Sequence, residues 1–131
     1  IYFQGKEWRT TEALFQAMRF KDVEIKEAIR LEKSPMGAKF KAKKHKDKMV
    51  IDPMGSIDKL NMEICVALKL KQYPNLKEML IKTGSSLIYE DVSTRKNRGS
   101  SLFWGAVLNK DGSLDGENVL GKIWMNERDK L

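Results

Sequence analysis

Three polar side chains near the start of the sequence have the types and spacing that chemistry requires. Glu12, Gln16 and Arg19 are separated by four and then three residues, which on a helix brings them onto one face. Apolar residues lie between them in the sequence. A carboxylate, an amide and a guanidinium in line beside apolar positions indicate a site rather than a solvated surface.

Glu12 is the member of this row with the clearest chemical use. It can act as a general base or stabilise positive charge that develops on a sugar. Its expected place in the first turn of a helix favours the ionised carboxylate, because the helix dipole is positive there. The alternative is a glutamate that begins a helix and has no chemical role.

Two later motifs offer contacts to a ligand. Trp104 can place its indole against a planar base, and Gly105 permits the backbone to approach closely. The alternative is a core tryptophan beside a bend in a strand. Asn118 can bind a ligand hydroxyl or merely cap the helix that follows it.

Lysine dominates the charge of the chain, which carries 25 Lys and Arg against 18 Asp and Glu, a net charge of +7. Six of the lysines crowd into one short segment. They are Lys39, Lys41, Lys43, Lys44, Lys46 and Lys48. One interpretation is an anionic partner, either phosphate groups or nucleic acid, and the other is a solvated lysine-rich loop.

Composition argues against several other chemistries. With one cysteine (Cys65) and one histidine (His45), neither a disulfide framework nor a His/Cys zinc site can form. The sequence has no phosphate-binding loop ending in Gly-Lys-Ser/Thr and no dinucleotide-binding glycine motif, so we expect no metal and no cofactor. No apolar run approaches the roughly 18 residues of a membrane helix, and we expect a cytoplasmic protein without a membrane partner.

The elements that must position these residues are mostly helices. A short strand and turn are expected over 1–8, followed by a helix that Thr10 or Thr11 caps and that runs to about residue 21. Further helices are expected at 22–31, after Ser34-Pro35, at 57–72, from Pro74 to Gly84, and after Asn118. Strands or turns are expected at 87–89 and 102–108, and loops at 95–101 and 109–117. This pattern predicts a single α+β domain over 1–131, mostly helical with a few short strands.

The longest expected helix carries two neighbouring rows of apolar positions. The first row is Ile57, Leu60, Ile64 and Leu68. The second row is Met62, Val66 and Lys69. A lysine at the end of such a row usually lays its stem on the core and keeps its charge in water.

Taken in order, these segments resemble the NADAR family, also called YbiA-like N-glycosidases, over nearly the whole chain. Gly5-Lys6-Glu7-Trp8 and then Glu12 to Phe20 match the first family motifs. The later matches are Ser34-Pro35-Met36, Met62 with Lys69-Leu70, Pro74 with Thr83-Gly84, Trp104-Gly105, and Asn118 to Met125. No single piece is specific, but the ordered set is.

The resemblance implies hydrolysis of the N-glycosidic bond between a phosphoribose or ADP-ribose and a nitrogen base. The implied substrates are ADP-ribosyl-guanine in nucleic acid and phosphoribosylamino-pyrimidine intermediates of riboflavin synthesis. By position Glu12 and Lys69 are expected to be catalytic, and a lysine can form a Schiff base with the opened sugar. The expected substrate-binding residues are Trp8, Gln16, Arg19, Lys43, Trp104, Gly105 and Asn118, with Lys43 meeting phosphate and Trp104 stacking on the base.

Three departures from the family keep other functions open. Arg19 stands in place of a family lysine, Ser101 in place of an acid, and Met54 in place of a tryptophan. The alternatives are a catalytically inactive domain that binds ADP-ribose or another nucleotide, and a basic module that binds nucleic acid. The sequence does not predict an oligomeric state.

Residues 1–5, Ile-Tyr-Phe-Gln-Gly, have two interpretations. They resemble the remnant of a cleavable expression tag, and they equally suit a native strand with a turn at Gly5. The family has an apolar strand at this place, which favours the native strand. The family domain usually starts earlier, with a Phe-Ser-Asn-Phe segment that this chain lacks, so we expect an incomplete N-terminal part.

Overall fold

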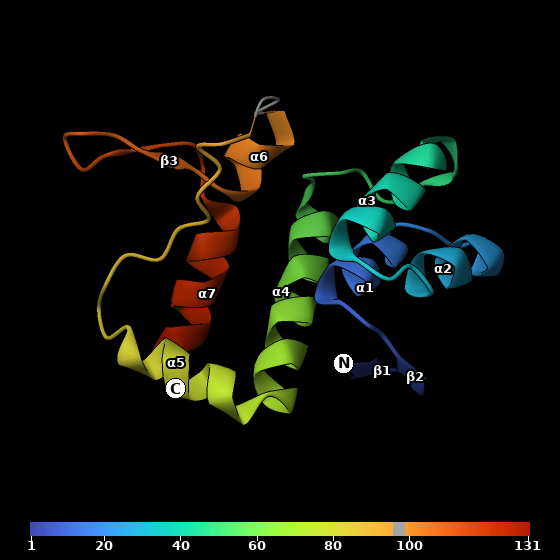
Figure 1. Ribbon diagram of the computed structural model, residues 1–131, viewed down its shortest axis with the longest axis horizontal. Helices are drawn as coiled ribbons and strands as arrows, with labels where there is room; N and C mark the ends of the chain where they lie inside the picture. Colours follow the sequence, from blue (N-terminus) through green and yellow to red (C-terminus); the bar gives the residue numbers. More distant parts are fainter. Residues whose placement is uncertain (96–98) are drawn as a thin grey trace. The chain divides into compact units, whose positions relative to one another are not determined.

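The computed structural model describes residues 1–95 and 99–131. The chain divides into two compact units, Ile1–Gln72 and Tyr73–Leu131, and each is described by itself. Helices dominate both units, and the described strands form two separate two-stranded sheets (Figure 1). The expected mostly helical α+β class is confirmed. Among these residues no helix has both the length and the apolar character that a membrane crossing requires.

A tight hairpin begins the first unit. β1 (Tyr2–Phe3) pairs antiparallel with β2 (Lys6–Glu7). Gln4 and Gly5 make the turn, with φ angles of 49° and 78°. Positive φ at both central residues matches the twist of a two-residue hairpin, so the strand and turn expected over 1–8 are confirmed.

The first helix, α1 (Thr11–Ala17), carries Glu12 and Gln16 of the polar row, and Arg19 follows in the turn after it. Its cap is Thr10, whose Oγ1 accepts a hydrogen bond of 3.0 Å from the Ala13 backbone N–H, as Thr caps do. The helix is shorter than expected and does not reach residue 21. The chain leaves it because Phe20, which is 2% exposed, forms an isolated antiparallel bridge with Met49.

Three more α-helices and a short 3-10 helix complete the first unit. They are α2 (Val23–Arg30), α3 (Pro35–Lys44), η1 (Lys46–Lys48) and α4 (Ser56–Gln72). The interpretation of the lysine-rich segment as a loop is wrong for most of its length, because it forms α3. Lysine and alanine are good helix formers, and Ala38 and Ala42 bury one side of this helix.

The long helix α4 turns a different face inward than its first apolar row suggested. Ile57 and Leu60 are 54% and 53% exposed, whereas Met62 and Val66 of the second row are buried. The expectation is therefore wrong for Ile57 and Leu60. The physical reason is Asp58, which is fully buried in an ion pair and fixes which side of α4 faces the unit.

The second unit contains three helices and one hairpin among its described residues. They are α5 (Pro74–Lys82), α6 (Gly99–Trp104), β3 (Val107–Leu108) paired antiparallel with β4 (Leu114–Asp115), and α7 (Val119–Asp129). Pro74 begins α5, and Gly84 follows it with a φ of 59°, both as expected from their conformational preferences.

Four expectations for this unit are wrong in whole or part, one of them the loop expected at 109–117, in which Leu114–Asp115 form β4. Residues 87–89 form no strand, because the Asn118 side chain, rather than a strand, bonds the backbone there. Residues 102–104 belong to helix α6, so only 107–108 of the expected strand is one. The loop expected at 95–101 is helical from Gly99 on, and residues 96–98 lie outside the described part of the chain.

Candidate active site

The polar row on α1 is a connected set of hydrogen bonds. Gln16 Nε2 donates to Glu12 Oε1 over 2.9 Å, and Arg19 Nη1 donates to Gln16 Oε1 over 3.0 Å. Gln16 and Arg19 are buried, while Glu12 is half-buried. The expectation that the three side chains share one face is confirmed. The row holds the Glu12 carboxylate at the edge of the core.

Asp58 completes this row and was missed by reasoning from the sequence. Arg19 donates from Nε to Oδ1 over 2.8 Å and from Nη2 to Oδ2 over 2.7 Å. The backbone N–H of Met54 donates to Oδ2 over 2.9 Å. The Arg19 guanidinium also lies 4.7 Å from the centre of the Phe15 ring, a favourable distance for a cation over an aromatic face.

An acid in the first turn of a helix is usually a surface residue that complements the helix dipole, so its position alone does not mark Asp58 as a buried ion-pair partner. The available signal was its spacing. Asp58, Met62, Cys65 and Lys69 follow one another by four, three and four residues, so they share one face of α4.

The N-terminal part of the chain runs antiparallel to α4. At one end of α4 Gln72 exchanges two hydrogen bonds, of 2.7 and 2.8 Å, with the backbone of Tyr2. At the other end Asp58 binds Arg19. As residue numbers rise from Tyr2 to Arg19, the partners on α4 therefore move back from Gln72 toward Asp58.

This register places Glu12 near Cys65, one helical turn before Lys69 on α4. Glu12 comes seven residues before Arg19, which lies just past the end of α1. Cys65 and Lys69 lie about 10 and 16 Å from Asp58 along α4, at 1.5 Å per residue. The electrostatics agree, because burial first and the Glu12 charge second raise the pKa of Cys65 to about 12. Lys69 is half-buried, and its ammonium has no salt-bridge partner among residues 1–95 and 99–131.

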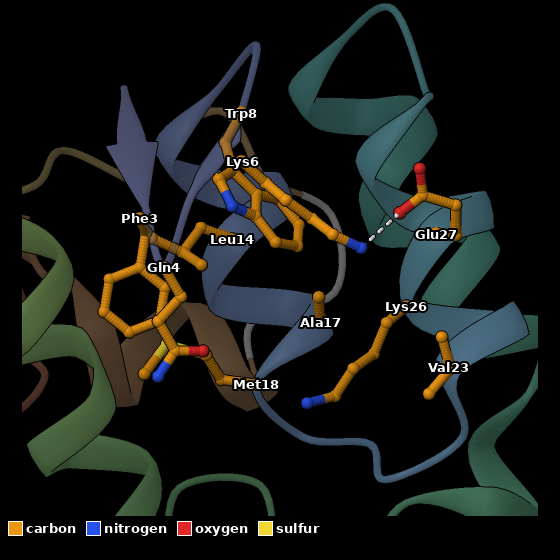
Figure 2. A pocket seen from close by; sticks show the side chains of 10 residues that line it. All are labelled: Phe3, Gln4, Lys6, Trp8, Leu14, Ala17, Met18, Val23, Lys26 and Glu27. Carbon is orange, nitrogen blue, oxygen red and sulfur yellow. Dashed lines mark hydrogen bonds and ion pairs between the residues drawn. The ribbon is translucent and has the colours of Figure 1, made fainter.

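A pocket of about 210 Å³ lies between the hairpin, α1 and α2 (Figure 2). Trp8 lines it, and Figure 2 shows the Lys6 ammonium reaching across it to Glu27 over 3.2 Å. The other lining residues are Phe3, Gln4, Leu14, Ala17, Met18, Val23 and Lys26. Leu14, Ala17 and Met18 lie on the side of α1 opposite the polar row. Of the predicted substrate-binding residues, the pocket therefore contains Trp8 and not Gln16 or Arg19.

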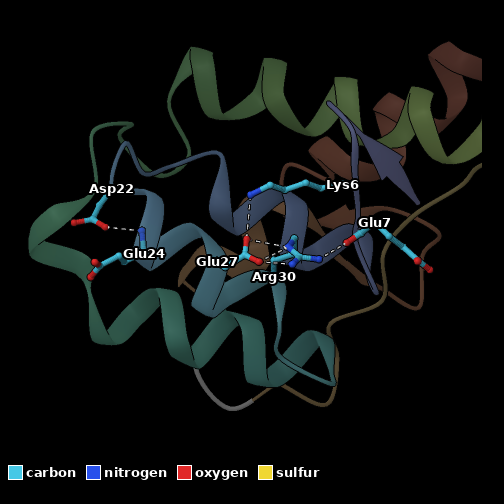
Figure 3. Close-up of polar contacts among 6 residues, drawn as sticks. All are labelled: Lys6, Glu7, Asp22, Glu24, Glu27 and Arg30. Carbon is cyan, nitrogen blue, oxygen red and sulfur yellow. Dashed lines mark hydrogen bonds and ion pairs between the residues drawn. The ribbon is translucent and has the colours of Figure 1, made fainter.

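A charged cluster fastens the hairpin to α2 (Figure 3). Glu27 accepts hydrogen bonds from both Lys6 and Arg30, and Arg30 Nη1 donates to the Glu7 carbonyl over 3.0 Å. The Arg30 hydrogen bond, aided by Lys6, lowers the pKa of Glu27 to about 2. The cluster fixes the strand that precedes Trp8, which is 7% exposed.

Lys43 lies on the exposed side of α3, as do Lys39 and Lys44. Phe40, between them, is 64% exposed. The predicted contact of Lys43 with phosphate stays a prediction. Within the described part of the chain, no group of three His, Cys, Asp or Glu side chains is placed to hold a metal ion.

The remaining predicted site residues belong to the second unit. Trp104 is half-buried and packs edge-to-face on Phe103, with ring centres 4.8 Å apart. Asn118 is 2% exposed, begins α7 in the left-handed conformation and makes no side-chain cap bond. Its predicted ligand contact, like the stacking predicted for Trp104, stays a prediction.

The Asn118 amide is bonded to the backbone of its own unit. Its Nδ2 donates to the Ile88 carbonyl over 2.9 Å, and its Oδ1 accepts from the Glu90 N–H over 3.1 Å. Gly105 and Gly121 are positions of close approach beside it. A Cβ on Gly105 would lie 2.5 Å from the Glu90 carbonyl oxygen, and one on Gly121 would lie 2.3 Å from that of Ile88.

Comparison with known proteins shows which family and which fold this chain resembles. The family model described as the NADAR domain matches residues 1–131. The proteins named N-glycosidase YbiA from Shigella boydii serotype 4 (strain Sb227) and Escherichia coli (strain K12) are each 28% identical over 131 residues, which is 100% of this chain and 75% of theirs. The NMR structure of the E. coli protein YbiA is similar with a TM-score of 0.78 and 28% identity, over 99% of this chain and 71% of that one.

Proposed function

We propose that this chain, which belongs to the NADAR domain family, is an N-glycosidase. The bond it would hydrolyse joins a phosphoribose or ADP-ribose to a nitrogen base. The substrate classes are ADP-ribosyl-guanine in nucleic acid and phosphoribosylamino-pyrimidines of riboflavin synthesis. Relatives 28% identical to this chain are named N-glycosidases, which supports the reaction type, while the substrate classes follow from the family.

The observation that supports this proposal most is the way Glu12 is held. Its carboxylate accepts the Gln16 amide N–H, and the Gln16 amide is in turn fixed by Arg19. Hydrogen bonds of this kind keep a catalytic group in one orientation, so less reorganisation is needed during the reaction. Lys69 follows Cys65 on α4 by one helical turn, and the pKa of Cys65 is raised by burial first and by the Glu12 charge second, which supports a place for Lys69 near Glu12.

In the proposed reaction the bond between C1′ and the base nitrogen breaks. The electron pair leaves with the base, which takes up a proton, and C1′ becomes positively charged. The ionised Glu12 carboxylate stabilises that charge. A water oxygen then bonds to C1′ and loses its proton, which leaves the free sugar.

Lys69 has two candidate roles in this scheme. As an amine it would bond to C1′ of the ring-opened substrate and displace the base, which takes up a proton, to give a Schiff base that water later hydrolyses to release the sugar. As an ammonium it would act through its charge alone. Reduction with borohydride during turnover separates them, because only the Schiff base leaves the sugar covalently attached to Lys69, which mass spectrometry detects.

Turnover tests the proposal directly. The protein is incubated with guanine-ADP-ribosylated DNA and with a phosphoribosylamino-pyrimidine, and release of the base is measured. We expect Glu12→Gln and Lys69→Ala each to lower kcat by about 10²–10⁴-fold, the usual range for a positioned catalytic group. Lys71→Ala and Glu63→Gln, on the same helix as Lys69, serve as matched controls and should keep wild-type rates.

Failure of the wild-type protein to release base from either substrate would overturn the proposed reaction. Calorimetry then decides between the two alternatives. Binding of ADP-ribose without release of a base would identify an inactive nucleotide-binding domain. Binding of unmodified nucleic acid, unaffected by Glu12→Gln, would identify a basic nucleic-acid-binding module.

One observation favours a substrate that is part of a nucleic acid over a free nucleotide. Lys39, Lys43 and Lys44 share the exposed side of α3 with Phe40. Lysines that contact phosphates make binding depend steeply on salt, and exposed aromatic rings stack on bases. We expect the affinity for modified DNA to fall with salt, and the slope to become shallower in Lys43→Ala, while Lys122→Ala on α7 leaves it unchanged.

A further inference from the structure

A row of polar side chains runs from α4 through the core to the candidate catalytic carboxylate. Asp58 binds Arg19, Arg19 binds Gln16, and Gln16 binds Glu12, with hydrogen bonds of 2.7–3.0 Å throughout. Asp58 is fully buried, and Gln16 and Arg19 are 4% and 8% exposed. The three inner members are thus shielded from water, and only Glu12 reaches the edge of the core.

The chemistry of the row gives it a single direction. A guanidinium can only donate hydrogen bonds, so the Gln16 group that faces Arg19 must be its amide oxygen. The amide nitrogen then necessarily points the other way, toward Glu12. An amide turned by 180° would place its oxygen against the Glu12 carboxylate and its N–H against Arg19, and both contacts would be repulsive.

Asp58 sets the orientation of the guanidinium that begins this sequence of contacts. Its two oxygens accept hydrogen bonds from Nε and Nη2 of Arg19. This bidentate contact fixes the plane of the guanidinium. The backbone N–H of Met54 holds the carboxylate itself. With Nε and Nη2 held in this way, Nη1 is left pointing at Gln16.

We propose that Asp58 is a positioning residue for the reaction, acting through Arg19 and Gln16 to hold Glu12 in its productive orientation. This inference rests on the proposed N-glycosidase function. It also explains Arg19, the position at which this chain departs from the family lysine. A planar guanidinium spans Asp58 and Gln16 at once with a fixed angle between its donors, whereas an ammonium is a point charge without that plane.

A double-mutant cycle on turnover tests the proposal. Asp58→Asn keeps the shape of the side chain but removes its charge. We expect kcat to fall about 10–100-fold with little change in KM, because orientation rather than binding is lost. In the Glu12→Gln background Asp58→Asn should leave kcat almost unchanged, because there is no longer a carboxylate to position. Equal losses in both backgrounds would overturn the proposal.

A second variant covers the case in which Asp58→Asn does not fold. Gln16→Met has a similar volume and removes the amide link while leaving the ion pair between Arg19 and Asp58 in place. It should lower kcat by a similar factor, and this effect on kcat should again disappear in the Glu12→Gln background. Glu63→Gln is the matched control, because Glu63 is a half-buried carboxylate of α4 that lies outside the row. Wild-type kcat in Gln16→Met would overturn the proposal.

A measurement without substrate separates this proposal from the proposed function. In the wild-type protein the Gln16 side-chain amide protons should exchange slowly with solvent, as seen by ¹⁵N NMR. Loss of Asp58 should speed their exchange, and Arg19→Lys should have an intermediate effect. If the wild type turns over no substrate, the function fails but this result still stands. Unchanged Gln16 exchange in the Asp58 variant would refute the positioning role.

Discussion

Arg19 and Asp58 form a two-pronged ion pair inside the first unit, although 39 residues separate them in the sequence. The side chains are 10% and 0% exposed. Each charge is therefore paired where water does not reach it. The pair joins the turn after α1 to the beginning of α4, and the polar row of Glu12, Gln16 and Arg19 ends on it.

Removal of one partner should destabilise the protein strongly. Asp58→Ala leaves the Arg19 charge buried without its counter-charge, and we expect a loss of about 3–5 kcal/mol in the free energy of unfolding. The double variant Arg19→Met, Asp58→Leu should recover much of that loss, because it removes both charges. Urea unfolding followed by circular dichroism measures both. A double variant as unstable as Asp58→Ala would contradict this account.

Cys65 should be inert toward thiol reagents at neutral pH while the protein is folded. Burial, together with the negative charge of Glu12, raises the pKa of the thiol to about 12 from an ordinary value of 9.0, and only the thiolate is reactive. A disulfide reagent should label it only after denaturation. Rapid labelling of the folded protein at pH 7 would show that the thiol is accessible and ionised.

The same thiol should make stability fall at high pH. The protonated thiol is favoured in the folded state, so its contribution is fully present below pH 9, the ordinary pKa, and is lost as the pH rises toward about 12. The loss approaches about 1.4 kcal/mol per pH unit within this range. Unfolding of the wild type and Cys65→Ala between pH 8 and 11 measures it. Parallel curves for the two proteins would contradict the prediction.

Glu27 should make stability depend on pH at the acid end. Its pKa is lowered from 4.5 to about 2, chiefly by the Arg30 hydrogen bond and further by Lys6. Its contribution is therefore present above pH 4.5 and is lost as the pH falls toward 2. The side chain is 36% exposed, so the effect should be small and weaken with salt.

Comparison of wild type with Glu27→Gln at pH 6 and pH 2.5 measures this contribution. The difference in stability between the two proteins should shrink at the lower pH. Glu24→Gln, which is exposed on the same helix, is the control for the general effect of acid. A difference that grows on acidification would have the wrong sign and would refute the assignment.

Two helical glycines should respond differently to alanine. In Gly121→Ala the new methyl group would lie 2.3 Å from the Ile88 carbonyl oxygen and 2.4 Å from the Asn118 amide. Both groups are held in place by hydrogen bonds, so we expect Gly121→Ala to lower the free energy of unfolding by about 1–3 kcal/mol. In Gly37→Ala the nearest atom, 2.8 Å away, ends the flexible Glu32 side chain, which can move. Thermal unfolding of both variants makes the comparison.

Much of the local structure could be predicted because its signals are local. Thr10 caps α1, Pro74 begins α5, and Gly84 follows that helix with a positive φ. The common face of Glu12, Gln16 and Arg19 likewise follows from spacing alone. Each of these depends on the conformational preferences of a few neighbouring residues.

The strand expected at 87–89 shows where such local signals fail. Those residues favour β structure, but the Ile88 carbonyl, like the Glu90 N–H just after them, bonds the side-chain amide of Asn118 and not a neighbouring strand. A strand needs a partner, and whether one is present is decided by the packing of the unit rather than by propensity.

The sequence by itself determined which side chains share a helical face and which family the ordered motifs belong to. It did not determine that Asp58 would be the buried partner of Arg19, or that α4 would turn Met62 inward and leave Leu60 exposed. Spacing in the sequence determines which side chains share a helical face. Whether that face is buried, and which ion pairs form there, depends on residues that are distant in the sequence and pack against it. Only the tertiary structure shows that Asp58 on α4 is connected through Arg19 and Gln16 to Glu12 on α1.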